Sequence, residues 1–139
     1  MHQEGCIFCK IVKGEIPCAK VYESANALAF LDIAPVRPGH ALVIPKAHYE
    51  TLFALPADLA VELLEAIQRV GGAVLAATGS GGLNLQMNVY RPAGQLVDHA
   101  HFHLVPRNEG DGLGLWPQTT YATPEAMEEL ARAVRQQLS

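Results

Sequence analysis

Three of the six histidines in the chain alternate within one short segment, His99-Ala100-His101-Phe102-His103. On an extended strand, alternate side chains point to the same face, so the three imidazoles would line one side and the apolar residues the other. A neutral imidazole, which prevails at pH 7, can attack phosphorus while its neighbours donate hydrogen bonds to phosphoryl oxygens. The same triplet could instead hold a divalent metal ion or form a solvated polar strand face. The spacing alone leaves these three interpretations open.

Two cysteines form a second group that could do chemistry, in Cys6-Ile7-Phe8-Cys9. The pair could be half of a zinc site, a redox couple, or two thiols in the core. A thioredoxin-like couple requires a helix that follows a strand, and no such strand precedes this segment. The chain has three cysteines and no export signal, which indicates metal or thiol chemistry rather than a disulfide framework. The third, Cys18, is predicted to be a small buried or half-buried residue.

The overall composition is that of an ordinary globular protein. Half of the residues are hydrophobic, 17% are charged, the formal net charge is −4 and the pI is near 5.8. This balance disfavours binding to a nucleic-acid backbone, which needs a basic face, but permits binding of one nucleotide. No apolar run approaches the roughly 20 residues of a membrane span, and the polar N-terminal residues do not form a signal peptide. We therefore expect a single domain over residues 1–139, a cytoplasmic location, no nucleic-acid partner and no membrane contact.

The elements that must position these side chains follow from the spacing of apolar residues. Five segments have the composition or the alternation of strands: residues 19–22, 27–32, 41–44, 83–90 and 101–105. Between residues 56 and 78, apolar residues recur at three- and four-residue steps, which is typical of one face of a helix. A last helix is predicted from the cap residue Thr123 and from Pro124 at the first helical position. Its apolar stripe consists of Met127, Leu130, Val134 and Leu138. The order of elements predicts an α+β fold with a mainly antiparallel sheet.

Residues 94–107 read Gly-Gln-Leu-Val-Asp-His-Ala-His-Phe-His-Leu-Val-Pro-Arg. This segment resembles the signature of the histidine-triad (HIT) superfamily: three histidines separated by apolar residues, two more apolar residues, and often Pro-Arg. The resemblance runs from about Cys6 to Trp116 and is strongest toward the bacterial HIT hydrolases that carry a CxxC. It implies a single HIT domain with a mainly antiparallel five-stranded sheet, one long central helix and a C-terminal helix, assembled as a homodimer.

The resemblance also implies catalytic roles for four histidines. His101 matches the family nucleophile, which forms a covalent nucleotidyl-imidazole intermediate that water then hydrolyses. His103 matches the residue that hydrogen-bonds the α-phosphate or the leaving group, and His99 matches the orienting member of the triad. His40 matches a fourth histidine, which is expected to support His101 from behind.

A further set of residues is implied to hold the substrate together with His101 and His103: Asp32, Ile33, Asn88, Gly94 and Gln95. Asp32 and Ile33 match the segment that receives the ribose hydroxyls and covers the base. Asn88 matches a polar residue that contacts phosphate or ribose. Gln95 matches a phosphate-binding glutamine, and backbone amides near Gly94 would complete the phosphate cradle.

One position departs from the family pattern. The residue after Gln95 is usually Ser or Thr in catalytic members, and here it is Leu96. A hydroxyl there donates to the bridging or leaving atom, so the leucine removes one donor. Loss of one such transition-state hydrogen bond commonly lowers the rate on the order of 10²-fold.

The CxxC members of the family complete the cysteine pair with two histidines, and His48 and His99 match those positions. The resemblance therefore implies a metal site formed by Cys6, Cys9, His48 and His99. A closed set of two cysteines and two histidines is typical of structural Zn²⁺.

The function implied is that of a nucleotide-binding hydrolase or transferase. It would act on the α-phosphate of a nucleoside phosphoramidate or dinucleoside polyphosphate through a nucleotidyl-histidine intermediate, with purines preferred and no organic cofactor. Two alternatives come from other classes. The chain could be a non-catalytic nucleotide-binding or scaffold protein whose site is eroded at Leu96, or a metalloprotein that uses the triad itself as ligands.

Overall fold

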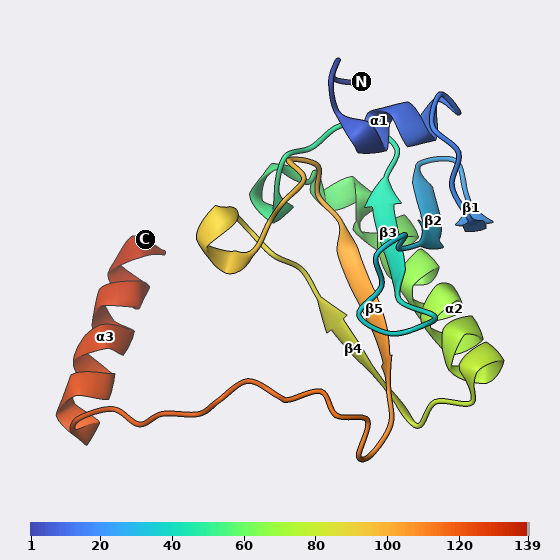
Figure 1. Ribbon diagram of the computed structural model, residues 1–139. Coiled ribbons are helices and arrows are strands. Elements are labelled where there is room, and N and C mark those ends of the chain that lie inside the picture. Colours follow the sequence, from blue (N-terminus) through green and yellow to red (C-terminus); the bar gives the residue numbers. More distant parts are fainter. Residues whose placement is uncertain (139) are drawn as a thin grey trace.

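One five-stranded antiparallel sheet organises the computed structural model, which describes residues 1–138 (Figure 1). Its strands are β1 (Lys20–Glu23), β2 (Ala27–Leu31), β3 (Ala41–Pro45), β4 (Gly82–Gln86) and β5 (Phe102–Arg107), in the order β1-β2-β3-β5-β4. The helices are α1 (Ile7–Val12), α2 (Ala60–Thr78) and α3 (Pro124–Gln137), with short 3-10 turns at Leu52–Ala54, Ala57–Leu59 and Arg91–Ala93. The predicted α+β architecture, with five strands, one long helix and a C-terminal helix, is confirmed.

The central strands β2 and β3 are buried on both faces. Ala27 and Ala29 of β2 pack with Val43 of β3 against α2, whereas Leu28 and Ile44 pack on the other side against α1. A strand buried on both faces reads as a continuous apolar run rather than an alternating one, which explains the composition of these segments.

Helix α2 covers one face of the sheet with its apolar stripe, of which Leu63, Val70 and Val74 are buried. Its α-helical part begins at Ala60, after a 3-10 turn, rather than directly after Pro56 as the periodicity suggested. The helix ends at a left-handed glycine, Gly79, which is a common helix stop.

Strand β5, which carries the end of the histidine segment, lies between β3 and β4. His103 is paired with Leu42 of β3 and with Gln86 of β4. The predicted strand over residues 83–90 is shorter than expected, because β4 ends at Gln86 and the chain then turns away from the sheet. The positive φ of Tyr90 (69°) is incompatible with a continued strand.

Helix α3 stands apart from the sheet at the end of an extended segment (Figure 1). It begins as predicted, with the Thr123 hydroxyl accepting a hydrogen bond from Ala126 and with Pro124 in the first turn. Its apolar stripe is exposed, since Met127, Leu130 and Val134 are all about half accessible and none of the helix residues is buried. None of the helices in residues 1–138 is long and apolar enough to cross a membrane.

Candidate active site and metal centre

The triad histidines lie on the side of the sheet that faces away from α2. Phe102 and Leu104 pack toward α2, so His101 and His103 point to the opposite side. His99 is fully buried, His101 is 6% exposed and His103 is half-buried. The side chain nearest to solvent in the triad is therefore that of His103.

The imidazole of His101 is held in one tautomer. Its Nδ1 lies 2.6 Å from the main-chain oxygen of His99, and only a protonated nitrogen can donate to that carbonyl. The proton therefore sits on Nδ1, and Nε2 carries a free lone pair. The ring of Phe8 packs edge-on against the imidazole, with centroids 5.1 Å apart, and burial lowers the pKa of His101. A neutral, oriented imidazole of this kind is able to act as a nucleophile.

His103 is held in the opposite tautomer by His40. The N–H of Val36 donates to Nδ1 of His40 (3.0 Å), so a neutral His40 carries its proton on Nε2. That Nε2 lies 2.9 Å from Nδ1 of His103 and donates to it, which leaves the His103 proton on Nε2. Burial lowers the pKa of His40 and lowers that of His103 to about 4. Both rings are therefore neutral near pH 7, and His103 presents an N–H donor. The direct hydrogen bond of His40 is thus to His103.

His40 is placed by the glycine that precedes it. Gly39 has a φ of +97°, and a Cβ there would lie 2.7 Å from Cγ2 of Thr78 and 3.3 Å from Cγ of Pro106. Both the backbone conformation and the close approach of α2 and β5 exclude a side chain. The loop before β3 is therefore fixed where it delivers His40 to His103.

A second set of potential metal ligands lies within this site, because Asp32, His40 and His103 are close enough to share an ion. Oδ2 of Asp32 lies 3.7 Å from Nε2 of His40. A metal would need the lone pair of that Nε2, but the contact from Val36 to Nδ1 requires Nε2 to carry the proton. The hydrogen-bond pattern therefore favours a proton donor and acceptor pair over a metal site, and it argues against a metalloprotein that uses the triad as ligands.

The segment expected to receive the nucleoside begins beside His40. Oδ1 of Asp32 accepts a hydrogen bond from the N–H of Ala34 (2.9 Å), which leaves Oδ2 directed toward His40. The side chain of Ile33 is fully exposed. The structure therefore places a carboxylate oxygen and a free apolar surface together at the edge of the triad.

Asn88 and Gly94 lie together at the β4 side of the strand that carries His103. Nδ2 of Asn88 donates to the carbonyl of Gly94 (3.3 Å), and its Oδ1 accepts from Nε2 of Gln86 (2.9 Å), the residue paired with His103. Gly94 has a φ of +97°, and a Cβ there would lie 3.3 Å from Nδ2 of Asn88. The two residues form a short polar rim that borders the triad strand.

Gln95 does not face this rim with its side chain, in contrast to the expected phosphate-binding role. The side chain is buried, and its amide bonds only to backbone: Oε1 accepts from Tyr90 (2.8 Å), and Nε2 donates to the carbonyls of Glu50 (2.6 Å) and Val97 (3.0 Å). No donor of this amide is left for a ligand. The neighbouring Leu96 is 77% exposed, so the residue that replaces the usual hydroxyl is an apolar side chain at the surface.

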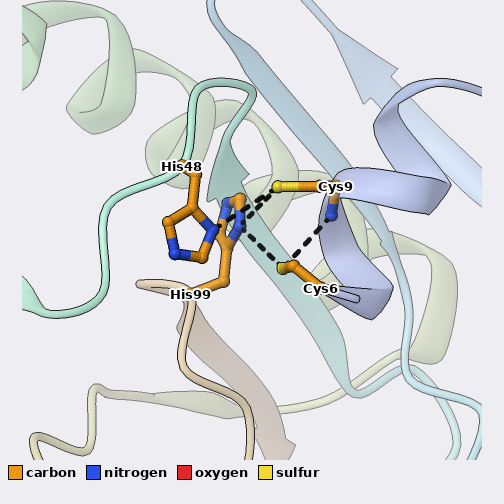
Figure 2. A group of neighbouring side chains, drawn as sticks. All are labelled: Cys6, Cys9, His48 and His99. Atoms are coloured by element: carbon orange, nitrogen blue, oxygen red, sulfur yellow. Dashed lines mark hydrogen bonds between the residues drawn. The ribbon is translucent and has the colours of Figure 1, made fainter. Parts of the chain in front are cut away.

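Cys6, Cys9, His48 and His99 converge at the start of α1, with both imidazoles turned toward the two sulfurs (Figure 2). Sγ of Cys6 lies 3.4 Å from Nδ1 of His99, and Sγ of Cys9 lies 3.4 Å from Nδ1 of His48 and 3.6 Å from that of His99. Tetrahedral zinc bonds of about 2.3 Å to sulfur and 2.0 Å to nitrogen place ligand atoms about 3.5 Å apart. The four side chains could therefore hold one metal ion without rearrangement.

The surroundings of these four residues also fit a metal. Backbone N–H groups point at both sulfurs, from Gln3 to Cys9 and from Cys9 to Cys6 (3.4 Å each), as thiolates require. Nε2 of the buried His99 donates to the carbonyl of Pro45 (2.8 Å), which leaves its Nδ1 lone pair toward the sulfurs. Burial raises the pKa of the Cys6 thiol. A bound cation would oppose this shift, because its charge stabilises the thiolate. His99 therefore contacts the cysteine sulfurs through its ring and His101 through its carbonyl.

The expectation for Cys18 is wrong, because this residue is exposed. The segment that leads from α1 into β1 runs along the surface, with Pro17 and Ala19 exposed on either side. Cys18 belongs to neither of the two groups of potential ligands found among residues 1–138.

Three residues that shape the site were not found from the sequence. Phe8 was visible only as an apolar residue between the cysteines, and Val36 acts through its backbone, which no side-chain pattern reveals. Tyr90 was assigned to a strand end, and only a glycine at this position would have signalled its left-handed backbone.

The fold and the site together define a class of protein: a sheet that carries a neutral, buried histidine with a free ring nitrogen beside a histidine donor, next to a cysteine–histidine cluster. The HIT domain family matches residues 13–110. Over 131 residues the chain is 45% identical to adenosine 5'-monophosphoramidase hnt1 of Schizosaccharomyces pombe, covering 93% of this chain and 95% of that protein.

Solved structures agree with this match. The crystal structure of a HIT family member from Bacillus subtilis has a TM-score of 0.89 at 41% identity and covers 98% of this chain and 99% of that one. A Zn-bound histidine triad family protein from Mycobacterium smegmatis has a TM-score of 0.75 at 35% identity, over 95% of this chain and 94% of that one. The chain therefore belongs to the HIT family.

Proposed function

We propose that the chain hydrolyses adenosine 5'-phosphoramidates, with His101 as the nucleophile. The observation that carries this proposal is the hydrogen bond from Nδ1 of His101 to the carbonyl of His99, which leaves a free lone pair on Nε2 in a desolvated site. The relative from Schizosaccharomyces pombe, which is named an adenosine 5'-monophosphoramidase, supports the same substrate class.

The reaction takes place in two displacements. Nε2 of His101 attacks the α-phosphorus, the P–N bond breaks, and the amine departs after it has taken up one proton. The nucleotidyl group is now bonded to Nε2, while Nδ1 keeps its proton toward the carbonyl of His99. Water then attacks phosphorus and the P–Nε2 bond breaks. The hydroxyl of this water stays on phosphorus, and its other proton balances the one taken by the amine.

The neighbouring residues stabilise this transfer. Nε2–H of His103 donates to the phosphate or to the leaving atom, and His40 keeps that proton in place by donating to Nδ1 of the same ring. Nδ2 of Asn88 and the amides near Gly94 bind the phosphoryl oxygens, while Asp32 accepts the ribose hydroxyls. Ile33, whose side chain is free, packs against a purine base.

The proposal is tested by acid-free trapping of the covalent intermediate with adenosine 5'-monophosphoramidate, followed by peptide mass spectrometry. We expect adenylate on His101 in the wild type and none in His101→Ala, which should still bind AMP within about tenfold. His2→Ala, which removes an exposed histidine, is the matched control. An adduct on another residue would overturn the assignment of the nucleophile. AMP binding without turnover of any phosphoramidate, adenylyl sulfate or diadenosine polyphosphate would instead support the scaffold alternative.

We also propose that Cys6, Cys9, His48 and His99 hold a structural zinc ion. The distances and the backbone donors support a closed four-ligand site, and the relative from Mycobacterium smegmatis is described as Zn-bound. The ion would fasten α1 to the residues before β5 and supply no Lewis-acid chemistry to the substrate, because all four ligands are protein side chains.

We further propose that the chain forms a homodimer. The exposed apolar stripe of α3 supports this, since an amphipathic helix that buries none of its residues against the rest of residues 1–138 gains little stability by itself. Light scattering after gel filtration should give twice the chain mass for the wild type. Leu130→Asp should reduce that mass, and Glu129→Gln on the same helix should not. A monomeric wild type would refute the dimer.

A further inference from the structure

Tyr90 has a backbone conformation that is rare for any residue with a side chain. Its φ is 69° and its ψ is 161°, a region that is essentially restricted to glycine. Among residues 1–138 it is the only non-glycine residue with a positive φ. Its side chain is 58% exposed and its ring lies 6.3 Å, centroid to centroid, from that of Phe53, which is 75% exposed. Burial of the tyrosine ring therefore cannot account for the strained backbone, and something else must hold it.

The N–H of Ala93 donates to the carbonyl of Tyr90 (3.1 Å) within the turn, and the other groups that hold this backbone belong to Gln95. Its Oε1 accepts from the N–H of Tyr90 (2.8 Å), and its own N–H donates to the carbonyl of Tyr90 (3.2 Å). Its Nε2 donates to the carbonyls of Glu50 and Val97 at 2.6 and 3.0 Å. The side chain is 2% exposed, so these bonds are protected from water. One buried amide thus joins three separate parts of the backbone.

Two of these parts border the proposed reaction centre. The turn that begins at Tyr90 ends at Gly94, whose carbonyl accepts from Asn88. Val97 lies two residues before His99, whose carbonyl fixes the tautomer of His101. The position of Gln95 therefore relates the polar rim of Asn88 and Gly94 to the nucleophile.

We propose that Gln95 is a positioning residue: its amide holds Tyr90 in the glycine-like conformation and so sets the distance between the phosphate-binding rim and His101. This role rests on the proposed function for its catalytic consequence, but the backbone clamp itself does not. Gln95 touches no substrate, since every polar atom of its amide is already bonded to backbone.

The test is a double-mutant cycle with a kinetic readout. Gln95→Met keeps the size of the side chain and removes its hydrogen bonds. We expect kcat for adenosine 5'-monophosphoramidate to fall about 10- to 100-fold with KM within about threefold, because misplacement of reacting groups acts on the transition state. In a Tyr90→Gly background the turn is no longer strained, and the same substitution should lower kcat at least fivefold less. Equal losses in the two backgrounds, or an unchanged kcat, would overturn the proposal.

A second readout does not depend on activity. Hydrogen exchange followed by NMR should find the Tyr90 amide protected in the wild type and at least tenfold faster in Gln95→Met. Thr51→Val, a buried neighbour of Glu50 that makes no bond to the turn, should leave it unchanged. If the wild type turns over no phosphoramidate but the exchange result holds, the proposed function fails and the clamp stands. A Tyr90 amide that exchanges equally fast in wild type and variant would refute the clamp.

If Gln95→Met does not fold, Tyr90→Gly alone still tests whether the backbone at Tyr90 is strained. Relief of the strained backbone should raise the melting temperature, whereas Tyr121→Gly, at an equally exposed tyrosine with an ordinary φ, should not. A lower melting temperature for Tyr90→Gly would show that the conformation is not strained, and would overturn the proposal.

Discussion

Substitution of Gly39 by alanine should damage both the stability of the chain and its active site. At a φ of +97°, a side chain makes the backbone unfavourable by at least about 1–2 kcal/mol. The new Cβ would also lie 2.7 Å from Cγ2 of Thr78, and overpacking of this kind typically adds about 1–3 kcal/mol. Together these give about 2–5 kcal/mol, or a fall in melting temperature of roughly 8–20 °C for a domain of this size.

Substitutions at two other glycines distinguish the cost of the backbone conformation from the cost of overpacking. Gly14 has a φ of +79° and nothing within 4 Å of its Cβ position, so Gly14→Ala should show the backbone effect alone, about 1–2 kcal/mol. Gly72 lies in α2 with open space and a helical backbone, so Gly72→Ala should be neutral or stabilise the chain by up to about 1 kcal/mol. Calorimetric melts of the three variants give the comparison.

The kinetic effect should be specific to Gly39. Because His40 follows directly, a displaced backbone would break its hydrogen bond to His103, and kcat should fall about tenfold or more while Gly14→Ala retains activity. A Gly39→Ala variant that melts within about 2 °C of Gly14→Ala, or that retains full kcat, would show that the close approach of Thr78 does not set the position of His40.

Three further perturbations test other parts of the site. Leu96→Ser should raise the rate of phosphoramidate hydrolysis by at most on the order of 10²-fold and leave the rate of adenylyl sulfate hydrolysis nearly unchanged. The reason is that a hydroxyl donor matters most for a poor leaving group. Equal effects on both substrates would exclude this role. Cys9→Ala should lose its zinc on elemental analysis, melt at a lower temperature and turn over more slowly, because Phe8 on the same helix packs against His101; a zinc-free wild type with the same melt and turnover would refute the metal site. Burial lowers the pKa of His103 from 6.5 to about 4, so between these pH values the unfolded chain binds a proton at this residue and the folded chain does not. The free energy of unfolding should therefore decrease as pH falls through this window, by at most about 3 kcal/mol for this residue. His103→Gln cannot take up that proton, so urea titrations should show its deficit relative to wild type shrinking between pH 7 and pH 4; a constant deficit would contradict the lowered pKa.

Much of the fold could be predicted because the apolar pattern is unambiguous. The uninterrupted runs that became β2 and β3, and the helical spacing of Leu63, Val70 and Val74, each admit one burial pattern. The alternation around His101 also predicted that the imidazoles would face away from the apolar side chains. Residues 87–90 could not be separated from β4, because alternation continues in the sequence after the hydrogen-bonded ladder has ended.

The sequence indicated which residues belong to the candidate site, but it did not indicate which hydrogen bonds they make. The family resemblance implies a phosphate contact for Gln95. Its amide instead turns inward to backbone groups, among them the carbonyl of Glu50, 45 residues away. The partner of His40 depended on a backbone N–H from Val36, which any residue except proline would supply. Hydrogen bonds made by main-chain groups do not depend on the residue type, so the sequence pattern could not predict them.

The divided use of His99 has a consequence for protein engineering. The group that orients His101 is a carbonyl oxygen, which all twenty amino acids possess, whereas the imidazole of the same residue contacts the two cysteine sulfurs and the carbonyl of Pro45. For the proposed reaction, any residue could supply the carbonyl of the first triad histidine, whereas its ring is required by the contacts with the cysteines and with the carbonyl of Pro45. A version of this scaffold without the cysteine–histidine cluster can be sought by redesigning position 99 together with Cys6, Cys9 and His48 as one apolar unit, without altering any residue of the proposed phosphate site.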